Sequence, residues 1–380
     1  MKKAYQADLV FIGNQDYIPN GIVEVNAEGI ISHIGNSASS EQIEIEKKQG
    51  FICPGFINTH CHLELSHLKG KVSEGTELHG FVQELQQFRA ANELDIENAI
   101  KSADAEMTKN GIVAVGDISN GTSSFDCKQN STILYHSFIE LFGFDSSQSK
   151  EIYTRGIALR QEAEELNLCA SVVPHSPYSV SNDLMKQIGE TKNNSSISIH
   201  NQETKGENEM FQNATGSMIN MLNRFGLDLS DFNALGKNSI YNYLPFLNPD
   251  VNTLLVHNTY TTEADMEWAS SQNKNIFWCF CPNANLYIEK TLPNLPSFLS
   301  KGLKCTLGTD SIASNWQLSI WAEIESIQKH FPNIKIEELI EMACQNGAEF
   351  LGINDKFGRI EIGKKPGINW VNEGKVEVLA

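Results

Sequence analysis

The stretch Pro54-Gly-Phe-Ile-Asn-Thr-His-Cys-His-Leu-Glu64 indicates both the fold of this chain and its chemistry. The apolar run from residue 51 to 58 predicts a buried strand, and His60 and His62 follow it. Alternate side chains of an extended strand point to the same side, so both imidazoles can converge on one point past the strand end. Such a pair is either one corner of a metal site or a pair of hydrogen-bonded structural histidines. The rest of the chain decides between these two interpretations.

The composition is that of an ordinary globular protein. The chain has 380 residues, of which 41% are hydrophobic and 20% charged, which allows one large α/β domain or two smaller ones. Its net charge of −18 argues against a nucleic-acid partner, because neutralising phosphates requires clustered Lys and Arg. No apolar run approaches the ~20 residues of a membrane span, and the first residues lack a signal-peptide core. We therefore expect neither a nucleic-acid nor a membrane partner.

The eight cysteines are scattered along the chain. Five of them lie in or beside apolar, strand-like runs: Cys53, Cys61, Cys169, Cys279 and Cys305. This distribution fits reduced, buried thiols of a cytoplasmic protein better than a disulfide framework. Cys61 stands between the two histidines, and strand alternation predicts that it points away from them into the packing.

The middle of the chain alternates predicted strands and helices. The predicted strands span 51–58, 111–118, 135–144, 168–173, 195–199, 252–257, 275–281 and 304–309. The predicted helices span 81–91 running on through 96–109, then 150–165, 182–189, 262–271, 296–301, 320–330 and 336–351. This alternation implies a parallel sheet, and eight strands fit a distorted (β/α)8 TIM-like barrel. A doubly wound open sheet is the alternative, which the lack of a G-x-G-x-x-G motif after the first strand weakens.

Both ends of the chain differ from this middle, because they contain short strands separated by Asn and Gly turns. That pattern is typical of antiparallel sheets. We predict one small β-sandwich domain composed of residues 1–52 plus 356–380, and a barrel domain of residues 53–355. The long insertion 205–250 follows the fifth predicted strand, so we expect it to roof the site.

Polar residues stand at the ends of the predicted strands, where a barrel of this kind has its active site. In chain order they are His60, His62, Asp117, Glu140, His175, His200, His257, Cys281 and Asp310. A lone histidine after an apolar strand is usually structural, but five of the ten histidines fall at these ends. His60, His62, His200 and Asp310 together make a site with three imidazoles and one carboxylate. Such a site suits Zn²⁺ or Fe²⁺, which would lower the pKa of a bound water towards ~7.

Five motifs in this order resemble signatures of the amidohydrolase superfamily. They are Pro54-Gly-Phe-Ile-Asn-Thr-His-Cys-His62, His200-Asn-Gln-Glu-Thr204, Leu255-Val-His-Asn258, Cys281-Pro-Asn-Ala-Asn285 and Leu307-Gly-Thr-Asp-Ser-Ile-Ala-Ser-Asn315. The resemblance is strongest to the aminohydrolase branch, which contains guanine, adenosylhomocysteine, methylthioadenosine and aminodeoxyfutalosine deaminases and triazine chlorohydrolases. It covers nearly the whole chain, because both β-rich ends match the split sandwich domain of that family.

The resemblance implies a role for each residue at these positions. His60, His62, His200 and Asp310 would hold one divalent metal ion per chain, zinc first and iron second. Asp310 would also take a proton from the attacking water and return it to the leaving amine. Glu203 would carry a proton to the substrate ring, and His257 would hydrogen-bond the water or the substrate group above the metal. His175 would contact the substrate. From their positions alone, Phe81 or His79 is a candidate for ring stacking, and the candidate anion anchors are Arg155, Arg89 and Arg160.

We therefore predict a metal-dependent hydrolase of C–N bonds. Its small-molecule substrate would be an amino-substituted N-heterocycle, purine-like or aminodeoxyfutalosine-like, deaminated by a metal-bound hydroxide. Attack on an amidine-like carbon puts charge on the ring nitrogen, so an acid has to stand there. The alternatives are an amidase, cyclic imidase or halide-releasing hydrolase on the same site, and a catalytically silent binding protein on this fold. We also expect a homodimer.

Overall fold

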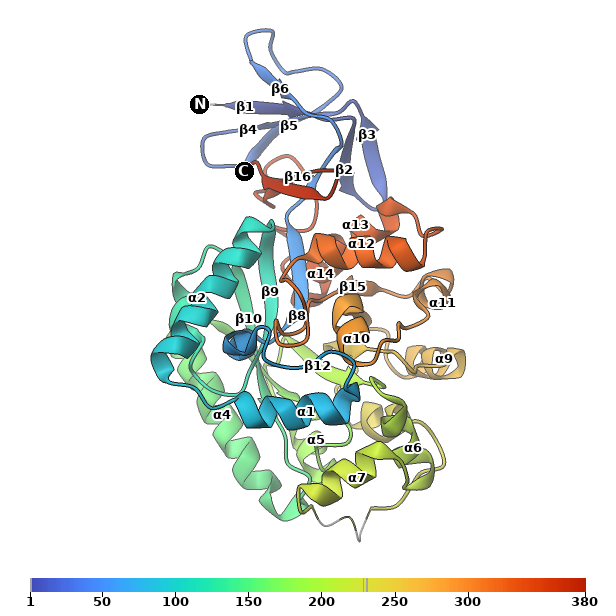
Figure 1. The fold of residues 1–380 in the computed structure, drawn as a ribbon. Helices are drawn as coiled ribbons and strands as arrows, with labels where there is room; N and C mark the ends of the chain where they lie inside the picture. Colours follow the sequence, from blue (N-terminus) through green and yellow to red (C-terminus); the bar gives the residue numbers. More distant parts are fainter. Residues whose placement is uncertain (1, 228, 230–231) are drawn as a thin grey trace.

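Parallel strands form two four-stranded sheets at the centre of the computed structural model, which describes residues 2–227, 229 and 232–380 (Figure 1). In the first sheet the order is β11 (Cys169–Pro174), β10 (Leu134–Leu141), β9 (Ile112–Ser119) and β8 (Phe56–Cys61). In the second it is β12 (Ser196–Asn201), β13 (Asn252–His257), β14 (Ile276–Phe280) and β15 (Cys305–Leu307). The strands lie within a few residues of the predicted ones, and the parallel pairing is confirmed.

The two parallel sheets adjoin each other along both of their edges. Cys61, the last residue of β8, bridges to Asp310 after β15, in parallel orientation. On the other side, the backbone N–H of His200 in β12 donates to the carbonyl of His175, which follows β11, over 2.9 Å. The strand interiors are almost entirely buried, as strands covered on both faces require. The strand ends that carry the polar residues are therefore brought together.

The predicted first strand is in fact two strands that belong to different sheets. β7 (Phe51–Pro54) ends before Gly55, and β8 begins after it. A Cβ on Gly55 would stand 2.4 Å from Cγ1 of Val113 and 2.8 Å from the carbonyl of Pro366, so only glycine allows this close crossing. β7 pairs with strands from both chain ends, whereas β8 pairs with β9. The change of sheet at Gly55 is a correction to the single strand 51–58.

Strands from the two chain ends form two further sheets, in the upper part of Figure 1. One has the order β5 (Ile31–Gly35), β4 (Ile22–Val25), β1 (Lys3–Gln6) and β6 (Ile45–Lys47). The other has the order β17 (Lys375–Val378), β16 (Ile368–Asn372), β7, β2 (Leu9–Gly13) and β3 (Asp16–Pro19). Their buried apolar side chains, among them Tyr5, Val10, Val23, Ile52 and Ile368, form a core of their own.

Helices follow the strands of the parallel sheets (Figure 1). They are α1 (Glu77–Phe88), α2 (Glu93–Lys109), α3 (Phe125–Asn130), α4 (Ser149–Glu165), α5 (Asn182–Gly189), α9 (Glu263–Gln272), α10 (Pro282–Ile288), α11 (Leu295–Ser300), α12 (Ile320–His330), α13 (Ile336–Ala343) and α14 (Gln345–Leu351). Two predicted helices are interrupted. The side chain of Asn92 accepts a hydrogen bond from the N–H of Asp95 and so begins α2 separately from α1. Cys344, with non-helical dihedral angles, separates α13 from α14.

The insertion 205–250 contains α6 (Lys205–Asn213), α7 (Ser217–Arg224), α8 (Ile240–Tyr243) and the 3-10 helix η3 (Leu244–Phe246). Residues 228 and 230–231 of this insertion lie outside the described part of the chain. Two other 3-10 helices, η1 (Leu63–Leu68) and η2 (Ser146–Gln148), follow β8 and β10. Among the described residues, no helix has both the length and the apolar character that crossing a membrane demands.

Candidate active site

Three imidazoles converge where β8 and β12 end. His60 is the penultimate residue of β8 and His62 follows the strand, and their Nε2 atoms are 3.1 Å apart. One ligand atom each of His60, His62 and His200 lies within 4.8 Å of the other two. The intervening Cys61 is buried in the core, as strand alternation predicts. The geometry therefore unites two histidines from one strand with a third from a strand of the other sheet.

A carboxylate from the end of β15 completes this group. Oδ1 of Asp310 lies 3.3 Å from Nε2 of His62 and 3.7 Å from Nε2 of His60. Its Oδ2 accepts a hydrogen bond from the hydroxyl of Ser314 over 2.8 Å. Burial by itself would raise the pKa of Asp310, but the hydrogen bond from His60 and the electrostatic effect of the nearby imidazole groups hold it well below its usual range. Asp310 is therefore ionised at neutral pH.

These four residues fit a divalent metal ion. Burial lowers the pKa of His60 and of His62, and it lowers the pKa of His200 to about 4, so all three imidazoles are neutral and can act as ligands. Nδ1 of His200 lies 2.8 Å from the carbonyl of His175 and must donate to it, which leaves Nε2 as the free lone pair. Three neutral nitrogens and one carboxylate oxygen form a donor set suited to Zn²⁺ or Fe²⁺.

Glu203 and His257 face each other beside this group. Oε1 of Glu203 lies 3.7 Å from Nε2 of His257, and both side chains are buried. Burial, reinforced by the charge of Asp310, raises the pKa of Glu203 well above its usual value. Burial likewise places the pKa of His257 well below its ordinary value. The pair therefore presents a carboxyl group with a raised pKa and an imidazole with a lowered pKa to the cavity.

The backbone of Glu203 is held by Glu207, a residue that our sequence interpretation did not consider. The carboxylate of Glu207, in the first turn of α6, accepts the N–H of Gln202 over 2.9 Å and the N–H of Glu203 over 3.2 Å. It also accepts the hydroxyl of Ser239. The sequence signal was available, because Thr204-Lys-Gly-Glu207 has the S/T-x-x-E spacing of a capping box.

The converging groups stand at the wall of a cavity of about 430 Å³. Most of its other lining residues are apolar and come from η1, α1, the segment after β10, α7 with its flanks, and the end of α10: Leu65, Leu78, Phe81, Val82, Leu85, Phe142, Phe144, Met221, Leu222, Phe225, Leu227 and Ile288. The insertion 205–250 thus contributes to the wall, as expected of a roof. A site that is apolar with a few convergent polar groups is typical of small-molecule binding.

The three expected substrate contacts have different positions. Phe81 and His175 line the cavity. Nδ1 of His175 is engaged by the hydroxyls of Ser179 and Ser176, at 2.6 and 3.0 Å. Arg155 is exposed in the middle of α4 and is not a lining residue, whereas Arg89 is. This placement argues against a substrate contact for Arg155, because α4 packs against the outside of β10 and β11.

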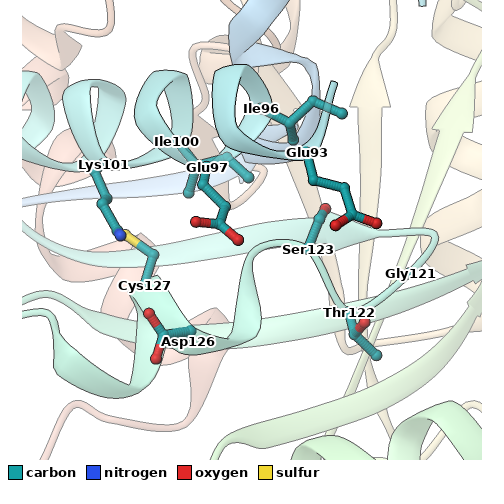
Figure 2. A pocket seen from close by; sticks show the side chains of 10 residues that line it. All are labelled: Glu93, Ile96, Glu97, Ile100, Lys101, Gly121, Thr122, Ser123, Asp126 and Cys127. Atoms are coloured by element: carbon teal, nitrogen blue, oxygen red, sulfur yellow. The ribbon is translucent and has the colours of Figure 1, made fainter. Parts of the chain in front are cut away.

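A second hollow of about 450 Å³ lies between α2 and the segment 121–127 (Figure 2). Its lining includes acidic residues on both walls, with Glu93 and Glu97 on α2 and Asp126 on α3 (Figure 2). Within the described chain, both clusters of three side chains that could hold a metal ion lie in the first cavity, and neither includes a residue of this hollow. The chemistry of the strand ends therefore belongs to the first cavity.

Comparison with known proteins agrees with this arrangement. A family model described as the amidohydrolase family matches residues 51–377. Among curated proteins, an adenosine deaminase of Helicobacter pylori is 27% identical over 320 residues, covering 83% of this chain and 77% of that protein. A 5′-deoxyadenosine deaminase of Methanococcoides burtonii is 26% identical over 360 residues, covering 89% and 76%.

Solved structures of other proteins are similar to this chain over almost its full length. The aminofutalosine deaminase of Helicobacter pylori, in complex with methylthio-coformycin, superposes with a TM-score of 0.82 at 25% identity, covering 98% of this chain and 93% of that chain. Guanine deaminase from C. acetobutylicum gives a TM-score of 0.68 at 16% identity, a likeness of fold. Because the family model spans most of the sequence, we conclude that this chain belongs to the amidohydrolase family and is an enzyme of that family.

Proposed function

We propose that this protein hydrolytically deaminates an amino-substituted N-heterocycle, specifically an adenine-type nucleoside. The observation that carries the proposal is the buried Glu203 carboxyl, which shares the cavity with His62, His200 and Asp310. A carboxyl group with a raised pKa holds its proton more tightly than a free carboxyl and can pass it to a ring nitrogen, which a simple amide substrate does not have. The printed names of the relatives, adenosine and 5′-deoxyadenosine deaminase, support the same substrate class.

We further propose that His60, His62, His200 and Asp310 hold one divalent ion, zinc in preference to iron. Three imidazoles and one carboxylate are a common donor set for catalytic zinc. When bound, such an ion lowers the pKa of a coordinated water to ~7 and so supplies a nucleophile at neutral pH.

The side chains around the cavity would then divide the proton transfers. Asp310, which is ionised, accepts a proton from the attacking water. Glu203 donates its proton to the ring nitrogen as the C=N bond takes up electrons. His257 hydrogen-bonds the water or the substituent that is attacked, and its neutral imidazole can do so as donor or acceptor. Ammonia leaves only after protonation, and Asp310 returns the proton that it took from the water.

The apolar wall of the cavity supports a nucleoside with an apolar 5′ substituent. Phe81 on α1, Phe144 after β10 and Met221 on α7 lie on this wall. Some relatives carry the names 5′-deoxyadenosine deaminase and 5-methylthioadenosine/S-adenosylhomocysteine deaminase, and these substrates lack the polar 5′-hydroxyl group. We expect aminodeoxyfutalosine, 5′-deoxyadenosine and 5′-methylthioadenosine to be better substrates than adenosine.

An ammonia-release assay with the zinc-loaded enzyme tests the proposal directly. The panel contains the three 5′-modified nucleosides, adenosine, guanine, a pterin and an aminotriazine, together with a cyclic imide and a chlorotriazine that are assayed for ring opening and for chloride. Release of ammonia from the nucleosides supports the proposal. Hydrolysis of a cyclic imide or release of chloride from a chlorotriazine, without any deamination, would favour the alternative leaving groups. A fully metal-loaded protein that turns over none of these compounds would favour the silent binding protein.

We propose that the two parallel sheets close into one distorted (β/α)8 barrel of residues 53–355, and that residues 1–52 plus 356–380 form a β-sandwich domain. The eight free cysteines of the chain support a reducing, cytoplasmic location. A homodimer remains our prediction, and sedimentation velocity is the experiment that decides it.

A further inference from the structure

One face of α1 lines the cavity along the whole length of the helix. The lining residues of α1 recur three and four residues apart, which is the spacing of a single helical face: Leu78, Phe81, Val82, Leu85, Gln86 and Arg89. Arg89, at the end of the helix, still has helical dihedral angles (φ −62°, ψ −30°) and therefore continues this face. The face is apolar from Leu78 to Leu85 and ends in a cation.

The guanidinium of Arg89 has no partner in the chain. Among the residues that the structure describes, no lysine and no other arginine lines the cavity. Glu140, Glu203 and Asp310 also line it, yet within this described part of the protein the guanidinium forms no ion pair or hydrogen bond with any of them. By contrast, the guanidinium of Arg160 on α4 is engaged by a carboxylate and a backbone carbonyl of the chain itself. Arg89 is therefore available to an anion of the substrate.

The backbone of Arg89 is tied to the segment that follows the candidate metal ligands. Nε2 of His67 lies 3.0 Å from the carbonyl oxygen of Arg89, close enough to donate a hydrogen bond to it. His67 belongs to η1, which begins directly after His62. Burial lowers the pKa of His62, and the positive charge of Arg89 acts in the same direction. Arg89 is thus held near the candidate ligands without pairing with the polar groups around them, so its anion belongs to an outlying part of the substrate.

A substrate can reach these groups from solvent. The side chains of Gln86 and Arg89 are exposed. Two aromatic rings of the lining are also open, since Phe142 is 54% and Phe225 is 42% exposed. Large apolar side chains left uncovered in a cavity are typical of a binding surface. An apolar extension of the substrate would cover such rings.

We propose that Arg89 binds a carboxylate at the end of an apolar 5′ substituent, so that the enzyme prefers nucleosides with such an acidic extension. The inference rests on the proposed function and refines its substrate class. One guanidinium matches one carboxylate through two parallel N–H···O hydrogen bonds. A 5′-phosphate fits less well, because its two negative charges would meet a single cation in a cavity that also contains the ionised Asp310.

The experiment compares charged and neutral forms of the same substrate. The charged forms are 5′-S-(ω-carboxyalkyl)-5′-thioadenosines of increasing chain length, and each is matched by its primary carboxamide. Deamination by the zinc-loaded enzyme is followed through the ultraviolet absorbance of the purine ring. We expect the wild type to prefer the carboxylate by about five- to tenfold in kcat/KM at the chain length that reaches Arg89, because a charge-assisted pair is stronger than a neutral hydrogen bond but weakened by solvent exposure.

Three variants assign the preference to this side chain. Arg89→Gln should abolish it, and the loss should appear in KM with kcat nearly unchanged, because Arg89 contacts the substrate away from the reacting atoms. Arg89→Lys keeps the charge but not the planar fork and should retain part of the preference. Arg155→Gln, the same change at an exposed position of α4 outside the cavity lining, should leave it intact. Added salt should weaken the wild-type preference by screening the pair.

The outcomes separate this inference from the proposed function. If the wild type deaminates 5′-methylthioadenosine but treats carboxylates and carboxamides alike at every chain length, the proposed function stands and the inference about Arg89 is overturned. An unchanged preference in Arg89→Gln overturns it as well. If adenosine 5′-monophosphate is a better substrate than every carboxylate, the anion is a phosphate and the carboxylate assignment is wrong. If no nucleoside is deaminated, both proposals fall.

Discussion

The ammonium of Lys128 lies 2.6 Å from Oδ2 of Asp117, and neither side chain has measurable exposure to solvent. Lys128 also donates to the hydroxyls of Ser119 and Ser137. The other oxygen of Asp117 accepts the backbone N–H of Leu63, the residue after His62, over 2.7 Å. The ion pair therefore anchors the chain at the point where it leaves the candidate metal site.

Replacing Lys128 by methionine leaves Asp117 buried without its counter-charge. We expect Lys128→Met to lower the free energy of unfolding by about 3–5 kcal/mol, the usual effect of removing one partner of a buried pair. Urea denaturation at pH 7 measures it. Lys101→Met, at an exposed site on α2, is the matched control. The double variant with Asp117→Asn should regain part of the loss. A Lys128→Met protein as stable as the control would show that the pair has no stabilising role.

The candidate metal ligands can be tested without any substrate. We expect elemental analysis of zinc-grown protein to give about one divalent ion per chain, and His62→Ala to reduce this content strongly, because three ligands hold an ion less well than four. Activity should disappear on chelation and return with Zn²⁺. His330→Ala, at an exposed position on α12, should keep the full metal content. Equal metal content in both histidine variants would contradict the assignment of His62.

Glu203 should be required for turnover but not for metal binding. Glu203→Gln removes the proton that we assign to the ring nitrogen and none of the four metal ligands, so we expect kcat to fall by roughly 10²–10⁴ with an unchanged metal content. Glu209→Gln on α6, the helix that begins two residues after Glu203, serves as the control, because Glu209 forms an ion pair with Lys205. A fully active Glu203→Gln enzyme would show that another group supplies the proton.

The stability of the protein should depend on pH through Glu207. Burial raises the pKa of Glu207 to about 7, despite the opposing hydrogen bonds from Ser239 and the backbone N–H groups. A raised pKa in the folded state means that the folded protein holds the proton more tightly than the unfolded chain. The contribution of protonated Glu207 to the free energy of unfolding is therefore complete below about pH 4.5. It is lost as pH rises towards 7, which lowers the free energy of unfolding by at most roughly 3 kcal/mol.

Denaturation of the wild type and of Glu207→Gln between pH 4.5 and 8 isolates this contribution from other titrations. The difference between the two stability curves should change over the interval from 4.5 to 7 and be constant above it. A difference that does not vary with pH would mean that Glu207 has an ordinary pKa in the folded protein. Glu209→Gln is again the matched control.

Rules that depend on short stretches of sequence were sufficient to predict much of the candidate site. Alternation along an extended strand predicted that His60 and His62 point to the same side and that Cys61 points to the other side. This follows because successive side chains of a strand point to opposite faces. Active sites of parallel barrels lie at the carboxyl ends of the strands. This rule predicted that His200, His257 and Asp310, which are far apart in the sequence, lie in one site. The period of the apolar residues also located the parallel strands to within a few residues.

The sequence by itself determined the parallel strands, the residues at their ends and their chemistry, since each depends on patterns a few residues long. Only the tertiary structure decided that the chain changes sheets at Gly55, because that break follows from close contacts with Val113 and Pro366. It also decided that Arg89 and not Arg155 reaches the cavity, and that Glu140 keeps one oxygen free. Which face of a helix or strand meets a cavity depends on how whole elements pack, and no local pattern encodes that packing.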